Sequence, residues 1–155
     1  MAQYKEHSLY KNVIEAKALI NAAIQEKEDE VIYWIIEDKK NNNIVGYIKL
    51  PAGVIKDKKR EIAFYFLKGY RTDGTPEEVL KGVIDYIFTK EEYETIITKF
   101  YAANEQDTEV LNDVLTKVGM TREGILRNRL INDEGRKIDK HIYLSLIHIW
   151  RCRRL

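Results

Sequence analysis

The stretch from Glu61 to Phe88 constrains the fold of this chain more than any other. Its first residues, Glu61–Leu67, are a short apolar and aromatic run, which is typical of a buried strand. The turn-forming segment Lys68–Gly74 follows, and an amphipathic helix comes next. A strand, a glycine-containing turn and a helix N-terminus in this order suit an anion, because unpaired amide groups and the positive end of the helix dipole point into the turn.

The predicted helix has a clear N-terminal signal. Thr75 and Glu78 have the spacing of a capping box, and Pro76 suits a first helical position, where no amide hydrogen is needed. Its apolar residues recur at helical spacing, and they are Val79, Leu80, Val83, Ile84, Ile87 and Phe88. Many α/β proteins contain such a unit with nothing bound in the turn, so an ordinary strand–turn–helix is the alternative interpretation.

The segments before and after this unit predict further helices and strands. Residues Ser8–Lys27 have the pattern of an amphipathic helix, and Val31–Ile36 and Ile44–Leu50 form a predicted hairpin. Gly46 within the hairpin indicates a bulge or a close backbone approach. Residues Thr95–Tyr101 read as a strand beyond a crossover helix, so we expect parallel pairing with the strand that starts at Glu61.

The second half of the chain continues the alternation of helices and strands. We expect Ala102–Asp107 to be a loop, and the apolar spacing of Val110–Val118 predicts a helix that ends at Gly119. Residues Ile125–Ile131 and Ile138–Leu146 form a predicted closing hairpin. The whole order predicts one α/β (α+β) domain with a mixed sheet and helices on both faces.

Composition excludes several classes of function. The 155 residues fit one domain, and a net charge of +1 gives no overall attraction to nucleic acid or to an anionic membrane. No apolar run approaches the roughly 20 residues of a membrane span. The single cysteine, Cys152, forms no internal disulfide, and His7, His141 and His148 lack metal-ligand spacing. We therefore expect a cytoplasmic protein without a metal site.

Two basic segments raise the question of RNA binding. The run Lys56–Arg60 could contact RNA or a phosphate group, but a solvated connection is the favoured interpretation. The segment 147–155 changes composition abruptly and combines tryptophan with arginines, as in Arg151–Arg154. A nucleic-acid-binding or membrane-binding tail is one interpretation. We expect instead a non-native or disordered tail, outside a single domain of residues 1–146.

Several motifs together resemble the GNAT N-acetyltransferase superfamily. They are Tyr70–Glu78, Ile84–Phe88, Lys117–Gly124 and the turn Asn132–Gly135, and the likeness covers roughly Ser8–Leu146. It is strongest to the branch that acetylates the N-termini of ribosomal proteins. The resemblance implies the GNAT fold, a mixed and mostly antiparallel sheet with one parallel strand pair that splays. Relatives begin with a further strand and helix, so this chain is expected to be N-terminally incomplete, with its Val31 strand an exposed edge.

The resemblance also implies an activity. GNAT enzymes pass the acetyl group of acetyl-CoA directly to a primary amine, here a protein N-terminus or a small molecule. Glu61 is the implied catalytic base, and a solvated strand-end carboxylate is the other interpretation. The implied cofactor-binding residues are Phe66, Leu67, Arg71, Thr72, Asp73, Gly74, Thr75, Asn104 and Thr108. No membrane or nucleic-acid partner is expected, and a homodimer is left open.

Some positions differ from the family pattern. Thr72 replaces the first of two glycines in the turn, and Thr108 and Leu111 stand where the family has an asparagine and a serine. Asn104 could substitute only if the loop is shifted. Leu115 occupies the position of a tyrosine that acts as general acid in many relatives. These departures leave open a degenerate, non-catalytic domain used for binding or assembly.

Overall fold

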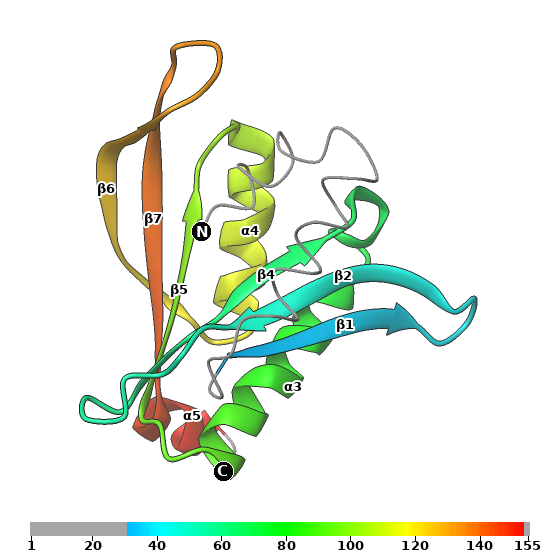
Figure 1. The fold of residues 1–155 in the computed structure, drawn as a ribbon, viewed down its shortest axis with the longest axis vertical. Coiled ribbons are helices and arrows are strands. Elements are labelled where there is room, and N and C mark those ends of the chain that lie inside the picture. Colours follow the sequence, from blue (N-terminus) through cyan, green and yellow to red (C-terminus); the bar gives the residue numbers. More distant parts are fainter. Residues whose placement is uncertain (1–30, 154–155) are drawn as a thin grey trace.

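The computed structural model describes residues 31–153, so the helix predicted for Ser8–Lys27 lies outside the described residues. Strands and helices follow one another as the sequence patterns predict (Figure 1). The elements are β1 (Ile32–Asp38), β2 (Asn43–Leu50), β3 (Lys59–Glu61), β4 (Ala63–Phe66), the 3-10 turn η1 (Lys68–Tyr70), α3 (Thr75–Lys90), β5 (Thr95–Tyr101), α4 (Glu105–Lys117), β6 (Thr121–Ile131), β7 (Lys137–Leu146) and α5 (Ile147–Arg153).

The strands form two sheets that share one continuous segment of chain. One sheet has the order β1-β2-β4 and the other the order β3-β5-β7-β6. The predicted single strand Glu61–Leu67 is divided at Ile62, because β3 pairs parallel with β5 while β4 pairs antiparallel with β2. Figure 1 shows β4 diverging from β5 beyond this point. The structure thus confirms the mixed sheet with one splayed parallel pair.

The last contacts before the splay involve Ile62. Its amide donates to the carbonyl of Ile97 at 2.9 Å, and the Thr98 hydroxyl donates to the Ile62 carbonyl at 2.7 Å. Parallel pairing ends with Glu61 opposite Ile97. The buried hydroxyl of Thr98 therefore satisfies a backbone group that no strand partner reaches.

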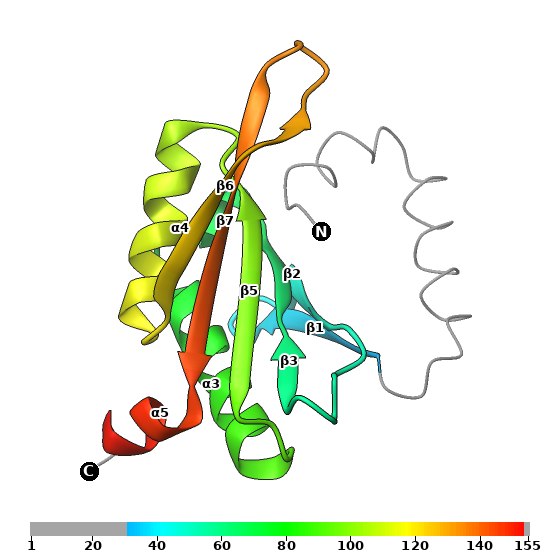
Figure 2. The same ribbon diagram turned by 90° about the vertical axis from the view of Figure 1, so that its left-hand side faces the viewer.

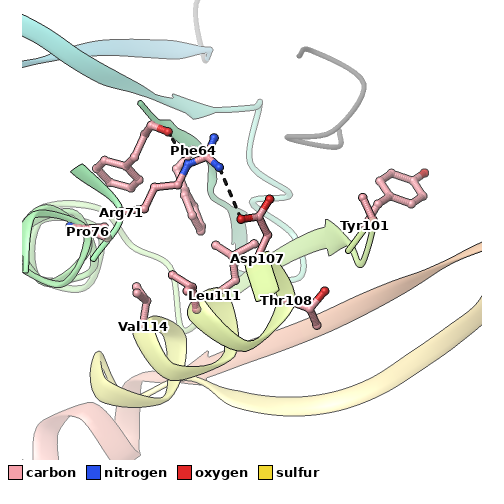
Figure 3. Close-up of a pocket in the computed structure, with 11 residues that line it drawn as sticks. Phe64, Arg71, Pro76, Tyr101, Asp107, Thr108, Leu111 and Val114 are labelled. Atoms are coloured by element: carbon pink, nitrogen blue, oxygen red, sulfur yellow. Dashed lines mark hydrogen bonds and ion pairs between the residues drawn. The ribbon is translucent and has the colours of Figure 1, made fainter. Parts of the chain in front are cut away.

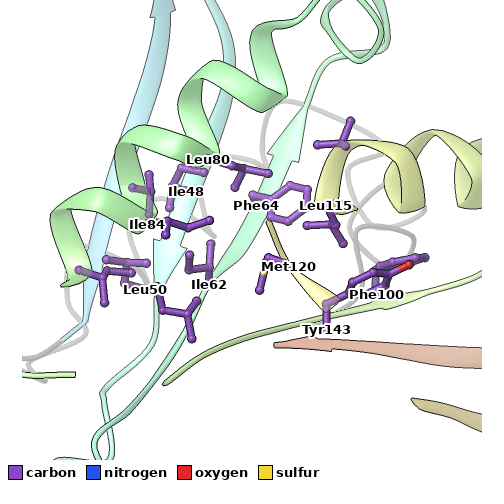
Figure 4. Packing of buried hydrophobic residues seen from close by; sticks show 14 of the residues in the cluster. Ile48, Leu50, Ile62, Phe64, Leu80, Ile84, Phe100, Leu115, Met120 and Tyr143 are labelled. Carbon is purple, nitrogen blue, oxygen red and sulfur yellow. The ribbon is translucent and has the colours of Figure 1, made fainter. Parts of the chain in front are cut away.

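Helices α3 and α4 pack side by side on one face of the strands (Figure 2). The apolar stripe predicted for α3 is buried there, as Leu80, Ile84 and Ile87 illustrate. Figure 4 shows the cluster that these side chains form with the strands and with α4. Other members of the cluster are Ile48, Leu50, Ile62, Phe64, Phe66, Ile96, Phe100, Leu115, Met120 and Tyr143. This core holds both walls of the splay in place.

The hairpin β1–β2 forms as predicted, and Gly46 has both predicted features. A Cβ atom at Gly46 would lie 2.1 Å from the Tyr65 carbonyl oxygen, so the two backbones approach closely there. The register of β1 and β2 also shifts between Ile36 and Glu37, beside Gly46. Among the described strands β1 pairs with β2 alone, and Ile35 is 64% exposed on this edge.

The N-terminus of α3 differs from the predicted capping box. Gly74, with a φ of 89°, is the N-cap, and Thr75 is the first helical residue, so its side chain makes no capping bond. The carboxylate of Asp73 accepts the Thr75 amide at 3.0 Å instead. The prediction was wrong because the left-handed conformation of Gly74 moves the helix start by one position.

The first turn of α4 occupies part of the predicted loop Ala102–Asp107. Asn104 is the N-cap, and its side-chain oxygen accepts the Asp107 amide at 2.7 Å. The carboxyl-terminal cap agrees with the prediction, since Gly119 has a φ of 91° and the Met120 amide donates to the Leu115 carbonyl at 2.9 Å. Apolar spacing alone missed the polar first turn.

The basic run Lys56–Arg60 is not a uniformly solvated segment. Arg60 is only 2% exposed, its Nε lies 3.4 Å from the Glu91 carboxylate, and its guanidinium covers the Tyr93 ring. Lys58 forms an ion pair of 2.7 Å with Glu94. Arg60 is therefore not part of the surface that the RNA-binding interpretation requires, whereas Lys58 stays exposed and has its charge paired.

Residues 147–153 are ordered as α5, so the expectation of a disordered tail is wrong for them. The Trp150 indole donates to the Asp85 carboxylate at 2.7 Å, and its ring lies 5.3 Å from that of Phe88. The Ile147 amide donates to the Glu94 carbonyl at 2.9 Å. A non-native origin of this segment stays a prediction.

Within residues 31–153, no helix is both long enough and apolar enough to cross a membrane. The same described residues contain no cluster of metal-ligating side chains.

Candidate functional site

A cleft lies where β4 and β5 separate. Its walls are Phe64 and Phe66 of β4, Pro76 at the start of α3, and Thr108 and Leu111 of α4 (Figure 3). The cavity within this cleft measures about 50 Å³. That volume holds a few water molecules, so a longer ligand needs the walls or their side chains to move.

The edge of β4 that faces the cleft carries backbone groups without a strand partner. The Leu67 amide donates to the Val45 carbonyl of the β1–β2 hairpin at 2.8 Å. Because successive backbone groups along a strand point to opposite edges, the amide and carbonyl of Phe66 point away from β2 and into the splay. This is the open strand edge that the resemblance implies. Leu67 itself is 43% exposed and does not line the cavity.

Arg71 bridges the two walls of the cleft. Its Nε donates to the Phe66 carbonyl at 2.8 Å, and its Nη1 lies 3.7 Å from the Asp107 carboxylate on α4 (Figure 3). The guanidinium also lies 5.7 Å from the centre of the Tyr65 ring. The same side chain therefore occupies the Phe66 carbonyl and ties β4 to the first turn of α4.

The turn before α3 keeps part of its predicted anion-binding capacity. The amides of Thr72 and Gly74 donate to no acceptor among residues 31–153, whereas the Thr75 amide is taken by Asp73. A Cβ atom at Gly74 would meet open space, so glycine is required there for its positive φ and not for closeness. Two of the predicted amides are thus available to an anion.

Asp73 works against an anion in this turn. Burial raises the pKa of its carboxyl group, but the hydrogen bonds from Thr75 and from its own backbone outweigh burial and hold the pKa below its usual value. The carboxylate is therefore ionised at neutral pH. In the structure the Asp73 carboxylate accepts the Thr75 amide at the start of α3, and its role as a cofactor-binding residue stays a prediction.

The two residues predicted on or near α4 have different positions. Thr108 lines the cavity, but its hydroxyl donates to the Asn104 carbonyl at 2.6 Å. The Asn104 side chain caps α4, donating to the Asp107 carboxylate at 2.8 Å, and it does not line the cavity. Asn104 is therefore engaged in capping, whereas Thr108 is at the site.

Positions where relatives carry polar side chains are apolar in this cleft. Leu111 lines the cavity and Leu115 is fully buried in the core. The hydroxyl of Tyr143 in β7 donates to the side-chain oxygen of Asn112. Asn112 is in α4, the helix that also carries Leu111 and Leu115. The described cleft thus has no hydroxyl at the position of the family's general acid.

Glu61 lies outside the cavity, on the last residue of β3. Its carboxylate is 3.5 Å from the Lys99 ammonium of the neighbouring β5, and both side chains are less than one-third exposed.

Sequence reasoning missed Asp107, which belongs to the acidic first turn of α4. The signal was present, since Asn104 followed three residues later by an acid is typical of a helix N-terminus.

Comparisons with known proteins agree with this geometry. A family model described as an acetyltransferase (GNAT) domain matches residues 1–142. An uncharacterised N-acetyltransferase, YoaA of Bacillus subtilis (strain 168), is 28% identical over 122 residues, which are 79% of this chain. The chain spans about 65% of the length of that relative.

Solved structures show the same fold. A point mutant of the spermidine N-acetyltransferase SpeG from Vibrio cholerae superposes with a TM-score of 0.73 at 18% identity, over 94% of this chain and 82% of that one. The spermidine N-acetyltransferase from the same organism, in complex with CoA and spermine, gives a TM-score of 0.71 at 18% identity, over 92% and 79% of the two chains.

These matches test both the predicted superfamily and the predicted branch within it. They confirm the predicted superfamily and its fold, but they do not confirm the ribosomal-protein branch. The family model covers most of the sequence, and its matched residues 1–142 include strands β1 to β6 and the first part of β7. The chain therefore belongs to the GNAT acetyltransferase domain family.

Proposed function

We propose that this domain transfers the acetyl group of acetyl-CoA to a primary amine. The observation that carries the proposal is the open edge of β4 at the splay, next to the N-terminus of α3. The chain fits acetyl-CoA at two places. The Thr72 and Gly74 amides suit a diphosphate, and the backbone edge at Phe66 suits an amide-containing arm.

Arg71 has the charge to join the same diphosphate. It must first leave the Phe66 carbonyl, and that movement also widens the cleft at its mouth. Asp107 competes with the diphosphate for the Arg71 guanidinium, because the Asp107 carboxylate lies 3.7 Å from the guanidinium in the structure. Binding of acetyl-CoA thus exchanges a carboxylate partner of Arg71 for a phosphate partner.

In this proposal, bound acetyl-CoA supplies an activated thioester carbonyl. The Phe66 amide is on the edge where a developing negative charge on that carbonyl needs a donor. Glu61 is the proposed base that takes a proton from the acceptor amine, directly or through water. The new bond joins the amine nitrogen to the acetyl carbon, the carbon–sulfur bond breaks, and CoA leaves as a thiolate. The thiolate takes up one proton from water, and Glu61 returns the amine's proton to the solvent, so the step balances.

The acceptor is a protein N-terminus or a small-molecule amine. The titles of the structural neighbours name spermidine, which makes a polyamine the first small molecule to test. A peptide with a free N-terminal alanine tests the ribosomal-protein branch. Release of free thiol from acetyl-CoA, followed with each acceptor, distinguishes the two classes.

Isothermal titration calorimetry with acetyl-CoA tests the first step. We expect saturable binding with the folded chain, together with an increase in its thermal midpoint. A folded sample that millimolar acetyl-CoA neither binds nor stabilises contradicts the proposal.

A non-catalytic GNAT domain is the second candidate function. It is favoured by Leu115, which is fully buried where many relatives place a tyrosine, and by Arg71, which fills the site of the expected arm. The variant Thr72→Gly separates the candidates. If acetyl-CoA binds only to that variant, the native turn is not a working site and the binding role holds.

A further inference from the structure

The face of the strands that points away from α3 and α4 carries an ion pair at the base of the splay. Glu61 of β3 is opposite Ile97 of β5, where the parallel pairing ends. Its carboxylate lies 3.5 Å from the ammonium group of Lys99, two residues further along β5. Ile62 and Phe100, the residues that follow Glu61 and Lys99, belong to the core cluster. Alternation therefore turns the ion pair to the opposite face.

A cross-strand ion pair of this kind often has a structural role only. Here, however, the contact of 3.5 Å is longer than the roughly 2.7–2.9 Å of a charge-assisted hydrogen bond. By comparison, the Lys58 ammonium donates to the Glu94 carboxylate at 2.7 Å. The side chains of Glu61 and Lys99 are also 28% and 29% exposed. Both groups thus keep hydrogen-bonding capacity for a ligand.

The pair lies where an acceptor must approach. In the proposed function, acetyl-CoA occupies the cleft on the helix side, and its thioester reaches the splay along the β4 edge at Phe66. An amine that attacks the thioester carbon therefore comes from the other face. There it meets Glu61, the proposed base, and Lys99 beside it.

Two opposite charges at this spacing match a free amino acid. Its amine nitrogen and its carboxylate oxygens are roughly 3 Å apart, close to the 3.5 Å between Glu61 and Lys99. An ammonium group beside Glu61 thus brings the carboxylate of the same molecule to Lys99, and each charge meets its opposite. A peptide N-terminus has an amide in place of that carboxylate and offers Lys99 no charge.

The surrounding charge is unfavourable for a polyamine. Lys140 of β7 is opposite Tyr101 of β5, and its ammonium lies 5.3 Å from the centre of the Tyr101 ring. Tyr101 and Lys99 point to the same face, because they are two residues apart on one strand. A polyamine bound at Glu61 extends its other ammonium groups over a face that carries two lysines, and like charges repel.

We propose, on the basis of the proposed function, that the acceptor is a free α-amino acid whose amine binds at Glu61 and whose carboxylate binds Lys99. Lys99 is then the residue that selects the acceptor. Before transfer the ammonium group gives one proton to Glu61, which passes it to water. The acetyl transfer then follows as in the proposed function.

The acceptor is tested by assaying each common amino acid that has a primary amine beside its carboxamide. The carboxamide keeps the amine and the side chain but lacks the carboxylate. We expect at least one amino acid to be acetylated with a KM about tenfold to a hundredfold below that of its carboxamide. Spermidine and a peptide with an N-terminal alanine are expected to be poorer acceptors than this amino acid.

The variant Lys99→Met removes the partner of the carboxylate and keeps most of the length of the side chain. It is expected to raise the KM for the amino acid by about tenfold to a hundredfold and to leave the KM for the carboxamide nearly unchanged. A purely structural role of Lys99 changes both values alike. Lys58→Met is the matched control, because it removes the lysine of the Lys58–Glu94 pair, and it is expected to keep the preference.

Binding without turnover is measured by calorimetric titration of the same amino acid into chain saturated with CoA, which has no acetyl group to transfer. The native chain is expected to bind the amino acid more tightly than the carboxamide, and Lys99→Met is expected to lose this difference. Circular dichroism establishes that each variant is folded.

Three results overturn the proposal. A native chain that binds acetyl-CoA and acetylates no amino acid refutes it, and acetylation of spermidine or the peptide in the same assay shows that the proposed function stands. Carboxamides acetylated as well as their amino acids show that no carboxylate is recognised. A folded Lys99→Met chain with the native preference places the carboxylate elsewhere. A chain that neither binds acetyl-CoA nor acetylates any amine contradicts the proposed function itself, and the choice of acceptor falls with it.

Discussion

Removing the charge of Asp107 tests how the candidate cleft opens. Asp107→Asn keeps the shape of the side chain and an oxygen that can accept the Asn104 amide group, now 2.8 Å away. The backbone amide that Asn104 caps at 2.7 Å is unchanged. The substitution therefore removes the ionic contact with Arg71 while leaving the first turn of α4 capped.

The size of the effect follows from the exposure of the pair. Arg71 and Asp107 are 3.7 Å apart, with 22% and 51% of their side chains exposed. Pairs of this kind contribute about 0.2–1 kcal/mol. If acetyl-CoA must displace Asp107 from Arg71, its affinity for Asp107→Asn is expected to rise by about 1.4-fold to 5-fold. The gain decreases at high salt because partly exposed charges are screened.

Calorimetric titration of acetyl-CoA into the native and variant chains measures this change. Glu105→Gln is the matched control, since Glu105 is in the same helical turn but is not among the residues that line the cavity. Both variants lose about 0.3–1 kcal/mol of helix-dipole stabilisation, and Asp107→Asn loses in addition the roughly 0.2–1 kcal/mol of its pair with Arg71. Weaker binding to Asp107→Asn, or equal binding to both variants, refutes the idea that Asp107 competes with the ligand for Arg71.

Three other outcomes are expected. Gly46→Ala forces a Cβ to within 2.1 Å of the Tyr65 carbonyl oxygen and is expected to cost about 1–3 kcal/mol in urea unfolding, whereas Gly82→Ala in α3 meets no atom within 4 Å and is expected to stabilise by about 1 kcal/mol. Glu61→Gln is expected to lower kcat by about 10²–10⁴ without changing the Kd for acetyl-CoA, and unchanged kcat removes Glu61 as the base. Burial lowers the pKa of His141 below the ordinary 6.5, so the unfolded chain binds the proton more readily than the folded chain. The unfolding free energy is therefore expected to fall as the pH decreases from 6.5 toward the pKa of the folded state. His141→Gln is expected to flatten this slope.

Local patterns predicted most elements of the fold. Strand Thr95–Tyr101 and the stop at Gly119 follow from apolar alternation and from a glycine with positive φ, and both depend on neighbouring residues only. The division of Glu61–Leu67 at Ile62 does not. The division arises because the first half of this segment pairs with β5 and the second half pairs with β2, so the two halves belong to different sheets. Pairing with strands distant in the sequence is a tertiary effect.

The candidate site shows the same limit in its chemistry. The resemblance to the GNAT superfamily implied that Arg71 and Thr108 bind the cofactor, and both line the cleft, but the resemblance could not show what Arg71 contacts. Its contacts include the Phe66 carbonyl, five residues back, and the Asp107 carboxylate on α4. The second contact exists only because Asn104 starts α4 early enough to bring Asp107 opposite the turn.

Arg71 also separates the two candidate functions, because each requires a different response from it. A working transferase must release the Phe66 carbonyl, so that the β4 edge is open to the thioester arm while the guanidinium meets the diphosphate. A binding domain without catalysis keeps Arg71 between β4 and α4 as a structural tie. In the first case Arg71→Gln lowers acetyl-CoA affinity more than it lowers the unfolding free energy. In the second it lowers the unfolding free energy, through the lost contacts with Phe66 and Asp107, and acetyl-CoA does not distinguish the variant from the native chain.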